Sequence, residues 1–135
     1  MELSHESRQD RKTIFIVDDD PAVRSCVSLL LADGAYHILT WENGEEALLQ
    51  SRAYKGEIHL LLSDFQMPGM SGVELATAMS ADRPQLKVLL MSGFPEGMLV
   101  LNEGWHFLAK PFIASQLRSL VAGLARPNRP SKFRD

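Results

Sequence analysis

The most informative segment of the sequence runs Thr13-Ile14-Phe15-Ile16-Val17-Asp18-Asp19-Asp20-Pro21. Its first residues are apolar or β-branched, and a continuous run of this kind predicts a strand that is buried on both faces. Three aspartates end the run, and Asp20 followed by Pro21 predicts an N-cap and the first position of a helix. The segment therefore predicts a buried strand, an acidic turn and a helix, in that order.

The same alternation continues along the chain. Further strands are expected at Tyr36–Trp41, Glu57–Ser63, Leu86–Met91 and His106–Ala109. One helix is expected to begin after Asp20, and the capping-box pairs Asn43/Glu46 and Ser71/Glu74 are expected to open two more. A last helix is expected from Ile113 to Leu124. Strands that alternate with helices in this way predict an α/β fold with a parallel sheet that is covered on both sides.

Length and composition fit one compact domain, with 135 residues of which 45% are hydrophobic and 23% charged. We expect a polar N-terminal segment at residues 1–11, the domain at 12–125 and a flexible C-terminal tail at 126–135. The net charge of −3 argues against direct binding of nucleic acid. The sequence has no apolar run long enough to cross a bilayer and no signal-peptide pattern, so we expect a cytoplasmic protein without membrane insertion.

Polar side chains stand where the predicted strands end. Asp18 and Asp19 follow the first strand, Asp64 the third, Ser92 the fourth and Lys110 the fifth. In an open parallel sheet these ends share one edge, where sites form. Clustered carboxylates repel one another, so the edge requires a hard cation with oxygen ligands, and Mg²⁺ is the natural candidate, for which Mn²⁺ can substitute. A carboxylate nucleophile, a metal ion, a lysine and a hydroxyl predict a phosphoryl-transfer site.

Four motifs occur in this order along the chain: IFIVDDD at residues 14–20, LLLSDFQMPGMSG at 60–72, VLLMSG at 88–93 and FLAKPF at 107–112. With these motifs the sequence resembles the receiver domains of two-component response regulators from Thr13 to Leu124. The resemblance implies a flavodoxin-like, doubly wound, five-stranded parallel sheet of order 2-1-3-4-5 with helices on both faces. It also implies a histidine kinase or a histidine phosphotransfer protein as phosphodonor, and a downstream protein target.

The resemblance assigns roles residue by residue. Asp64 matches the phosphoacceptor. The matched Mg²⁺ ligands are Asp18, Asp19, Asp64 and the backbone carbonyl of Gln66. The switch and phosphate-contacting positions are matched by Ser92, Lys110 and Phe107, and the bond before Pro111 is expected to be cis. Phosphorylation would then change the surface around the fourth helix, the fifth strand and the fifth helix.

The segment between Ser92 and Lys110 departs from the family pattern because it is unusually short. It predicts a short or irregular fourth helix and, like the phrase KVLLMSGF at residues 87–94, resembles the receivers of hybrid sensor kinases. We therefore hypothesise that the face through which transcriptional regulators of this family usually dimerise is compromised in this chain. Phe94 follows the switch serine closely, and we interpret it as a residue that lengthens the lifetime of the acyl phosphate by hindering the attacking water.

Rival functions remain open on the sequence alone. A haloacid-dehalogenase-type phosphatase also uses an aspartyl nucleophile and Mg²⁺, but it needs Thr or Val where Ala22 stands. A flavin- or nucleotide-binding module needs a glycine- or hydroxyl-rich phosphate loop after the first strand, where the sequence has aspartates. A third alternative is a degenerate receiver that acts only as a scaffold. Such a receiver would lack some of the residues that match the family's functional positions, whereas this sequence has all of them.

Structural roles are the simpler interpretation for several other residues. Asp20 is expected to cap a helix, and Met67 and Met70 are expected to pack within a loop. Trp41 and Trp105 are expected to be partly buried. Cys26 lies among apolar residues and is expected to be a buried structural thiol.

Overall fold

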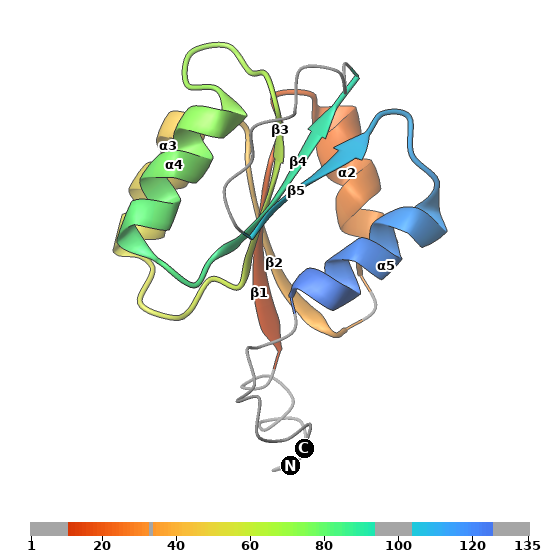
Figure 1. Cartoon of the computed structure of the whole chain (residues 1–135), viewed down its shortest axis with the longest axis horizontal. Coiled ribbons are helices and arrows are strands. Elements are labelled where there is room, and N and C mark those ends of the chain that lie inside the picture. The colour runs from red at the N-terminus through yellow and green to blue at the C-terminus, as the bar shows by residue number, and fades with distance from the viewer. Residues whose placement is uncertain (1–10, 33, 94–103, 126–135) are drawn as a thin grey trace.

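The computed structural model of the chain describes residues 11–32, 34–93 and 104–125 (Figure 1). Its elements in chain order are β1 (Lys12–Val17), α2 (Pro21–Leu30), β2 (Tyr36–Trp41), α3 (Gly44–Ala53), β3 (Leu60–Asp64), α4 (Gly72–Asp82), β4 (Lys87–Ser92), β5 (Trp105–Ala109) and α5 (Ala114–Leu124). The predicted fourth helix and Phe94 lie outside the described residues, as do residues 1–10 and the tail at 126–135.

The strands form one parallel sheet of order β2-β1-β3-β4-β5. Helices α3 and α4 cover one face of this sheet, and α2 and α5 cover the other (Figure 1). The predicted flavodoxin-like architecture is therefore confirmed, including the strand order that the family resemblance implied. In such a sheet the carboxyl ends of β1, β3, β4 and β5 lie along the same edge.

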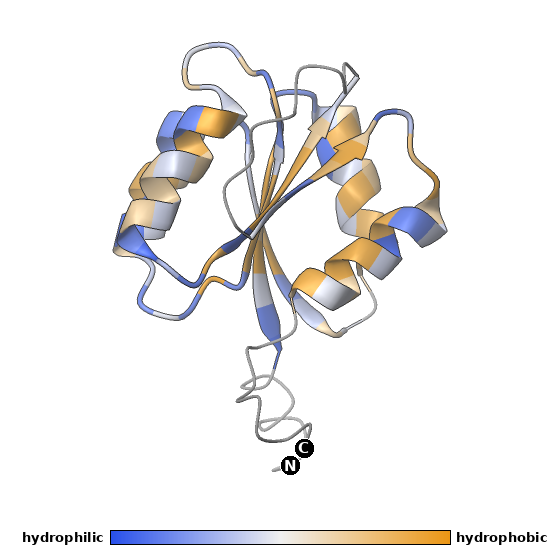
Figure 2. Cartoon of the chain, in the orientation of Figure 1, coloured by the Kyte–Doolittle hydropathy of each residue, from blue (hydrophilic) through white to orange (hydrophobic). Residues whose placement is uncertain are grey.

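Two apolar cores flank the sheet, because successive side chains of a strand point to opposite faces. Phe15 and Val17 of β1 belong to the core under α3 and α4, and Ile14 and Ile16 belong to the core under α2 and α5. The central strands are accordingly apolar along most of their length (Figure 2). All but one residue in each of β1, β3 and β4 are buried, which agrees with the apolar runs that these strands show in the sequence.

Capping side chains begin α2, α3 and α4 where the sequence predicts them, whereas α5 begins after Ile113 without a side-chain cap. The Asp20 carboxylate accepts from the Ala22 N–H at 2.9 Å, with Pro21 at the first helical position. Ser71 and Glu74 form a reciprocal capping box at the start of α4. Asn43 accepts from the Glu46 N–H at 2.7 Å and caps α3.

Two sequence-based expectations are wrong. The third strand begins at Leu60 and not at Glu57. The Thr13 N–H of β1 donates to His59 Nδ1 at 3.0 Å, and it therefore does not donate to a main-chain carbonyl of the preceding segment. Cys26 is exposed and not buried. The residues of α2 that face the sheet include Val27, and a residue one position earlier points about 100° away on a helix.

The packing expected of the loop and of Trp41 is confirmed, whereas Trp105 is buried more completely than expected. Met67 is buried and Met70 packs against the same core, so both methionines stabilise the loop after β3. Trp105 is 7% exposed, and Trp41 is half-buried against Phe15 with ring centroids 5.4 Å apart. Among the described residues, every helix is too short or too polar to traverse a bilayer.

Candidate functional site

The polar residues that follow the strands meet at one edge of the sheet. Asp18 follows β1, Asp64 ends β3, Ser92 ends β4 and Lys110 follows β5. Register aligns these ends, since Asp64 pairs with Met91 and Ser92 pairs with Ala109. The parallel topology therefore gathers residues that are far apart in the chain into one cluster.

Three carboxylates form the acidic part of this cluster. Asp18, Asp19 and Asp64 each offer one oxygen, and these oxygens all lie within 4.8 Å of one another. Asp18 is 1% exposed, Asp64 is intermediate and Asp19 is exposed. The cluster thus passes from the buried end of β1 to the solvent, which leaves it accessible from outside.

Lys110 supplies positive charge to the acidic cluster. Its Nζ donates to Asp64 Oδ1 at 2.9 Å and lies 3.6 Å from Asp18 Oδ2. The first contact is a charge-assisted hydrogen bond, whereas the second is too long for a hydrogen bond and acts by charge alone. The peptide bond between Lys110 and Pro111 is cis.

The pKa values of Asp18 and Lys110 reflect this crowding. Burial raises the pKa of Asp18 above its ordinary value, and the negative charges of Asp64 and Asp19 act in the same direction. The Asp20 N–H and the Lys110 ammonium oppose that rise without cancelling it. Burial alone would lower the pKa of Lys110, but its hydrogen bond to Asp64 and the charges of both aspartates outweigh burial and raise it. The lysine is therefore protonated, while Asp18 bears the cost of burying its charge.

The residues present fit a divalent cation. Among the described residues, no donor makes a hydrogen bond to Asp18 Oδ2, although this oxygen is buried. A buried carboxylate oxygen without a hydrogen bond is costly unless a cation compensates it. Carboxylate oxygens are the ligands that Mg²⁺ and Mn²⁺ prefer, and the exposed side of the cluster leaves room for water ligands.

The turn between β1 and α2 is held by polar contacts of its own. Asp18 Oδ1 accepts from the Asp20 N–H at 2.9 Å, and the Asp18 carbonyl accepts from Arg24 Nη1 at 2.6 Å. Sequence reasoning missed Arg24. The available signal was a cation in the first turn of a helix, where the helix dipole disfavours positive charge.

Gly72 was also missed by sequence reasoning. A Cβ on this residue would lie 2.1 Å from the carbonyl oxygen of Asp64, and the Gly72 N–H donates to the Phe65 carbonyl at 2.9 Å. The loop that follows Asp64 therefore returns so closely that only glycine fits. Gln66 lies in this loop and is exposed.

Two further predicted residues lie near the edge of the sheet. Ser92 is buried at the end of β4, and its carbonyl accepts from the Lys110 N–H at 2.7 Å. Phe107 of β5 packs against Phe65, the residue after Asp64, with ring centroids 5.9 Å apart and a 59° angle between the rings. The aromatic side chain on β5 thus contacts the segment that carries Asp64.

Known proteins share this sequence pattern and fold. Residues 14–122 match the family described as the response regulator receiver domain. The chain is 34% identical to the response regulator receiver protein CpdR of Brucella abortus, over 82% of this chain and 91% of CpdR. It is 32% identical to the transcriptional regulator NtrC of Escherichia coli K12 over 82% of this chain, and it spans only 24% of NtrC. It likewise spans 58% of the regulator FixJ of Bradyrhizobium diazoefficiens, at 27% identity.

Solved structures agree with these relatives. The receiver domain of the hybrid histidine kinase CckA is 32% identical, with a TM-score of 0.74 over 84% of this chain and 99% of that one. The chemotaxis protein CheY4 of Vibrio cholerae is 26% identical, with a TM-score of 0.72 over 84% of this chain and 98% of that one. The similarity to a hybrid-kinase receiver agrees with the resemblance noted in the sequence. The chain belongs to the family of response regulator receiver domains, the phosphoacceptor domains of two-component signalling.

Proposed function

We propose that Asp64 accepts a phosphoryl group from a histidine kinase or a histidine phosphotransfer protein. The observation that carries the proposal is the convergence of the carboxylates of Asp18, Asp19 and Asp64 with the ammonium group of Lys110. In this transfer a bond forms between an Asp64 carboxylate oxygen and phosphorus, while the bond between phosphorus and the donor imidazole nitrogen breaks. Positioning and charge neutralisation supply most of the catalysis in such reactions.

The residues that would hold Mg²⁺ are Asp18, Asp19, Asp64 and the backbone carbonyl of Gln66, and Mn²⁺ can substitute. The bound ion would neutralise both the carboxylates and the incoming phosphoryl oxygens. Lys110 lies within hydrogen-bonding distance of Asp64 and would contact the phosphoryl group as a point charge. Asp18 and Asp19 orient the acidic cluster and take no part in bond making.

The output would come from a change of surface around β5, α5 and the segment between β4 and β5. A phosphoryl group on Asp64 would attract the Ser92 hydroxyl and the Lys110 ammonium. Phe107 would then turn toward the space that Ser92 leaves. The contact of Phe107 with Phe65 supports this route, because Phe65 is bonded directly to Asp64. A downstream protein target would bind the changed surface.

The chain is a signalling domain, and we propose that it promotes its own phosphorylation and dephosphorylation without acting as a turnover enzyme. We place the receiver at residues 12–125, in the cytoplasm; the family match at residues 14–122 falls within these limits. The phosphatase alternative finds no support in the family match.

Acetyl phosphate with Mg²⁺ tests the proposal directly. Phos-tag electrophoresis should show one retarded species for the wild type and none for Asp64→Asn. Labelling should depend on Mg²⁺ and should reach one phosphoryl group per chain, without sustained turnover of p-nitrophenyl phosphate. Equal labelling of the wild type and Asp64→Asn would refute the assignment of Asp64, and sustained turnover would favour the phosphatase.

A further inference from the structure

The acidic turn between β1 and α2 is fixed by its backbone on both sides of Asp18. The Asp18 N–H donates to the Trp41 carbonyl at 3.2 Å, which extends the β1–β2 pairing beyond the end of β1. The Asp18 carbonyl accepts from Arg24 Nη1 at 2.6 Å. The first contact belongs to the sheet, and the second reaches back from the first turn of α2.

The carbonyl that Arg24 holds belongs to the peptide unit that joins Asp18 to Asp19. A peptide unit is planar, so fixing its oxygen also fixes its N–H and the Cα of the next residue. Asp19 is exposed, which leaves its side chain little packing to orient it. We infer that Arg24 is a positioning residue: through the Asp18 carbonyl it sets the direction in which Asp19 presents its carboxylate to the cation.

Arg24 contacts the acidic turn through both its main chain and its side chain. It lies in the first turn of α2, and positive charge there is disfavoured by the helix dipole. Its N–H donates to the Asp20 carbonyl at 3.0 Å, so its own backbone is anchored to the same acidic turn. The side chain and main chain of Arg24 therefore both contact the three-aspartate segment, and only the side-chain contact can be removed by substitution.

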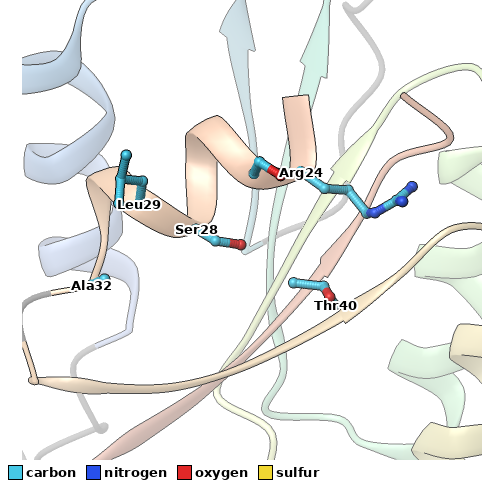
Figure 3. A pocket seen from close by; sticks show the side chains of 6 residues that line it. Arg24, Ser28, Leu29, Ala32 and Thr40 are labelled. Carbon is cyan, nitrogen blue, oxygen red and sulfur yellow. The ribbon is translucent and has the colours of Figure 1, made fainter. Parts of the chain in front are cut away.

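The surroundings of Arg24 allow that substitution without a buried void. Arg24 lines an open groove of about 590 Å³ between α2 and β2, together with Ser25, Ser28, Leu29, Ala32 and Thr40. Arg24 and Ser28 of α2 lie across this groove from Thr40 of β2 (Figure 3). Shortening the arginine would extend a groove that is already solvated, so the loss of its hydrogen bond can be separated from a loss of packing.

Arg118 provides a matched control. Its Nε donates to the Leu30 carbonyl at 3.1 Å, so it also joins an arginine to a backbone carbonyl of α2. This second contact lies at the C-terminal end of α2, away from the acidic cluster. Arg24→Ala removes a bond from α2 to the turn before it, whereas Arg118→Ala removes a bond from α5 to the last residue of α2.

Titration of the full chain with Mn²⁺, with free Mn²⁺ followed by electron paramagnetic resonance, tests the inference without any phosphorylation. Loss of a group that orients a metal ligand costs about 10- to 100-fold in metal affinity, and we expect Arg24→Ala to raise the Kd by this factor. Arg24→Lys should lose less, and Arg118→Ala should bind like the wild type. Urea unfolding without metal measures how far each alanine variant destabilises the fold.

The inference rests on the proposed cation site, and the titration separates the two. A wild-type chain that fails to bind Mn²⁺ would refute the proposed site itself. A wild-type chain that binds Mn²⁺ with unchanged affinity in Arg24→Ala would overturn only the role of Arg24. Equal weakening by Arg24→Ala and Arg118→Ala would also overturn it, because the effect would then follow from the stability of α2 and not from the turn.

Discussion

Lys110 Nζ lies 2.9 Å from Asp64 Oδ1, although β4 separates the strands that carry these two residues. The lysine side chain therefore spans the end of β4 to reach the end of β3. It passes within 3.6 Å of Asp18 Oδ2, at the end of β1. One ammonium group thereby links the ends of β1, β3 and β5.

Replacing Lys110 by methionine should destabilise the metal-free protein. Asp18 and Asp64 would then be left close together without the ammonium group, and loss of a hydrogen bond between charged groups costs about 1.5–3 kcal/mol when it is buried. Lys110 is 29% exposed, so solvent screening reduces the expected loss to about 1–2 kcal/mol. Urea unfolding in EDTA measures it, and saturating Mg²⁺ should recover part of the loss.

Lys55→Met is the control for this substitution, because Lys55 is exposed. It should leave the free energy of unfolding unchanged within the error of the measurement. A Lys110→Met variant as stable as Lys55→Met would show that the ion pairs of Lys110 contribute nothing to the fold.

Asp18→Asn should stabilise the metal-free protein and abolish its response to Mg²⁺. The pKa of Asp18 is raised from 3.8 by burial, so the folded protein retains a proton that the unfolded chain releases. The free energy of unfolding therefore falls as the pH rises from 3.8 through the folded-state pKa of Asp18. Above that pKa the full cost of burying the ionised carboxylate is present. Asparagine carries no charge at any pH and avoids the cost of burying one, so we expect Asp18→Asn to be more stable than the wild type at neutral pH.

Two measurements check the effect of Asp18→Asn. In EDTA, the gain should shrink as the pH is lowered through the folded-state pKa and vanish below 3.8, where Asp18 is protonated in both states. In Mg²⁺, the wild type should gain stability by binding the ion while the variant does not, which reverses their order. A variant that gains as much from Mg²⁺ as the wild type would remove Asp18 from the cation site.

The local pattern of the sequence predicted the elements because the strands of the sheet interior are largely apolar and because α2, α3 and α4 begin at a capping side chain, whereas α5 begins without one. β1 and α2 illustrate this, since complete burial of the strand and the Asp20 cap are both visible in consecutive residues. The gathering of Asp18, Asp64 and Lys110 was also predictable, because parallel strands share one carboxyl edge.

Contacts between segments could not be predicted in the same way. The bond from Arg24 to the Asp18 carbonyl depends on the angle at which α2 leaves the turn, and helical periodicity carries no information about that angle. The residue at which β3 begins to pair with β1 depends on the rotamer of His59, because its imidazole accepts the Thr13 N–H in place of a backbone carbonyl. The exposure of Cys26 depends on the rotation of α2 by a fraction of a turn about its axis.

His59 should make the fold sensitive to mild acid. Burial lowers the pKa of His59 below 6.5, and Lys12 acts in the same direction while Glu57 opposes it. The unfolded chain therefore takes up a proton more readily than the folded chain, and stability falls as the pH drops below 6.5 toward the folded-state pKa. Protonation also removes Nδ1 as the acceptor of the Thr13 N–H, a hydrogen bond worth about 1 kcal/mol.

His59→Gln should abolish this part of the pH dependence, because the amide oxygen can accept from Thr13 without titrating. The measurement is the urea midpoint of both proteins between pH 7 and pH 5. His37 is exposed, and His37→Gln should leave the slope of the wild type unchanged. If His59→Gln and the wild type lose stability in parallel over this range, His59 is not the titrating group.

Phe94 lies outside the described residues, and its predicted role follows from the sequence alone. A bulky apolar side chain two positions after Ser92 should hinder the water that hydrolyses the acyl phosphate. We expect phosphorylated wild type to decay more slowly than phosphorylated Phe94→Glu, with decay followed by Phos-tag electrophoresis after removal of acetyl phosphate. Equal decay rates would eliminate this role.

Gly72→Ala should damage both the fold and phosphorylation, because the added Cβ would lie 2.1 Å from the Asp64 carbonyl oxygen. A backbone oxygen cannot swing aside as a flexible side chain does, so β3 and the loop after it must separate. Overpacking of this kind typically costs about 1–3 kcal/mol. The shift would displace Asp64 relative to Lys110, and labelling by acetyl phosphate should slow more than the loss of folded protein explains.

Gly123→Ala is the matched control, because a Cβ on Gly123 in α5 would meet nothing within 4 Å. Alanine is a better helix former than glycine by about 1 kcal/mol, so this variant should be at least as stable as the wild type and should be labelled at the same rate. Thermal unfolding and acetyl phosphate labelling of the two variants in parallel separate a general effect of alanine from the clash. If Gly72→Ala matched Gly123→Ala in both measurements, the close return of the loop onto Asp64 would not constrain the site.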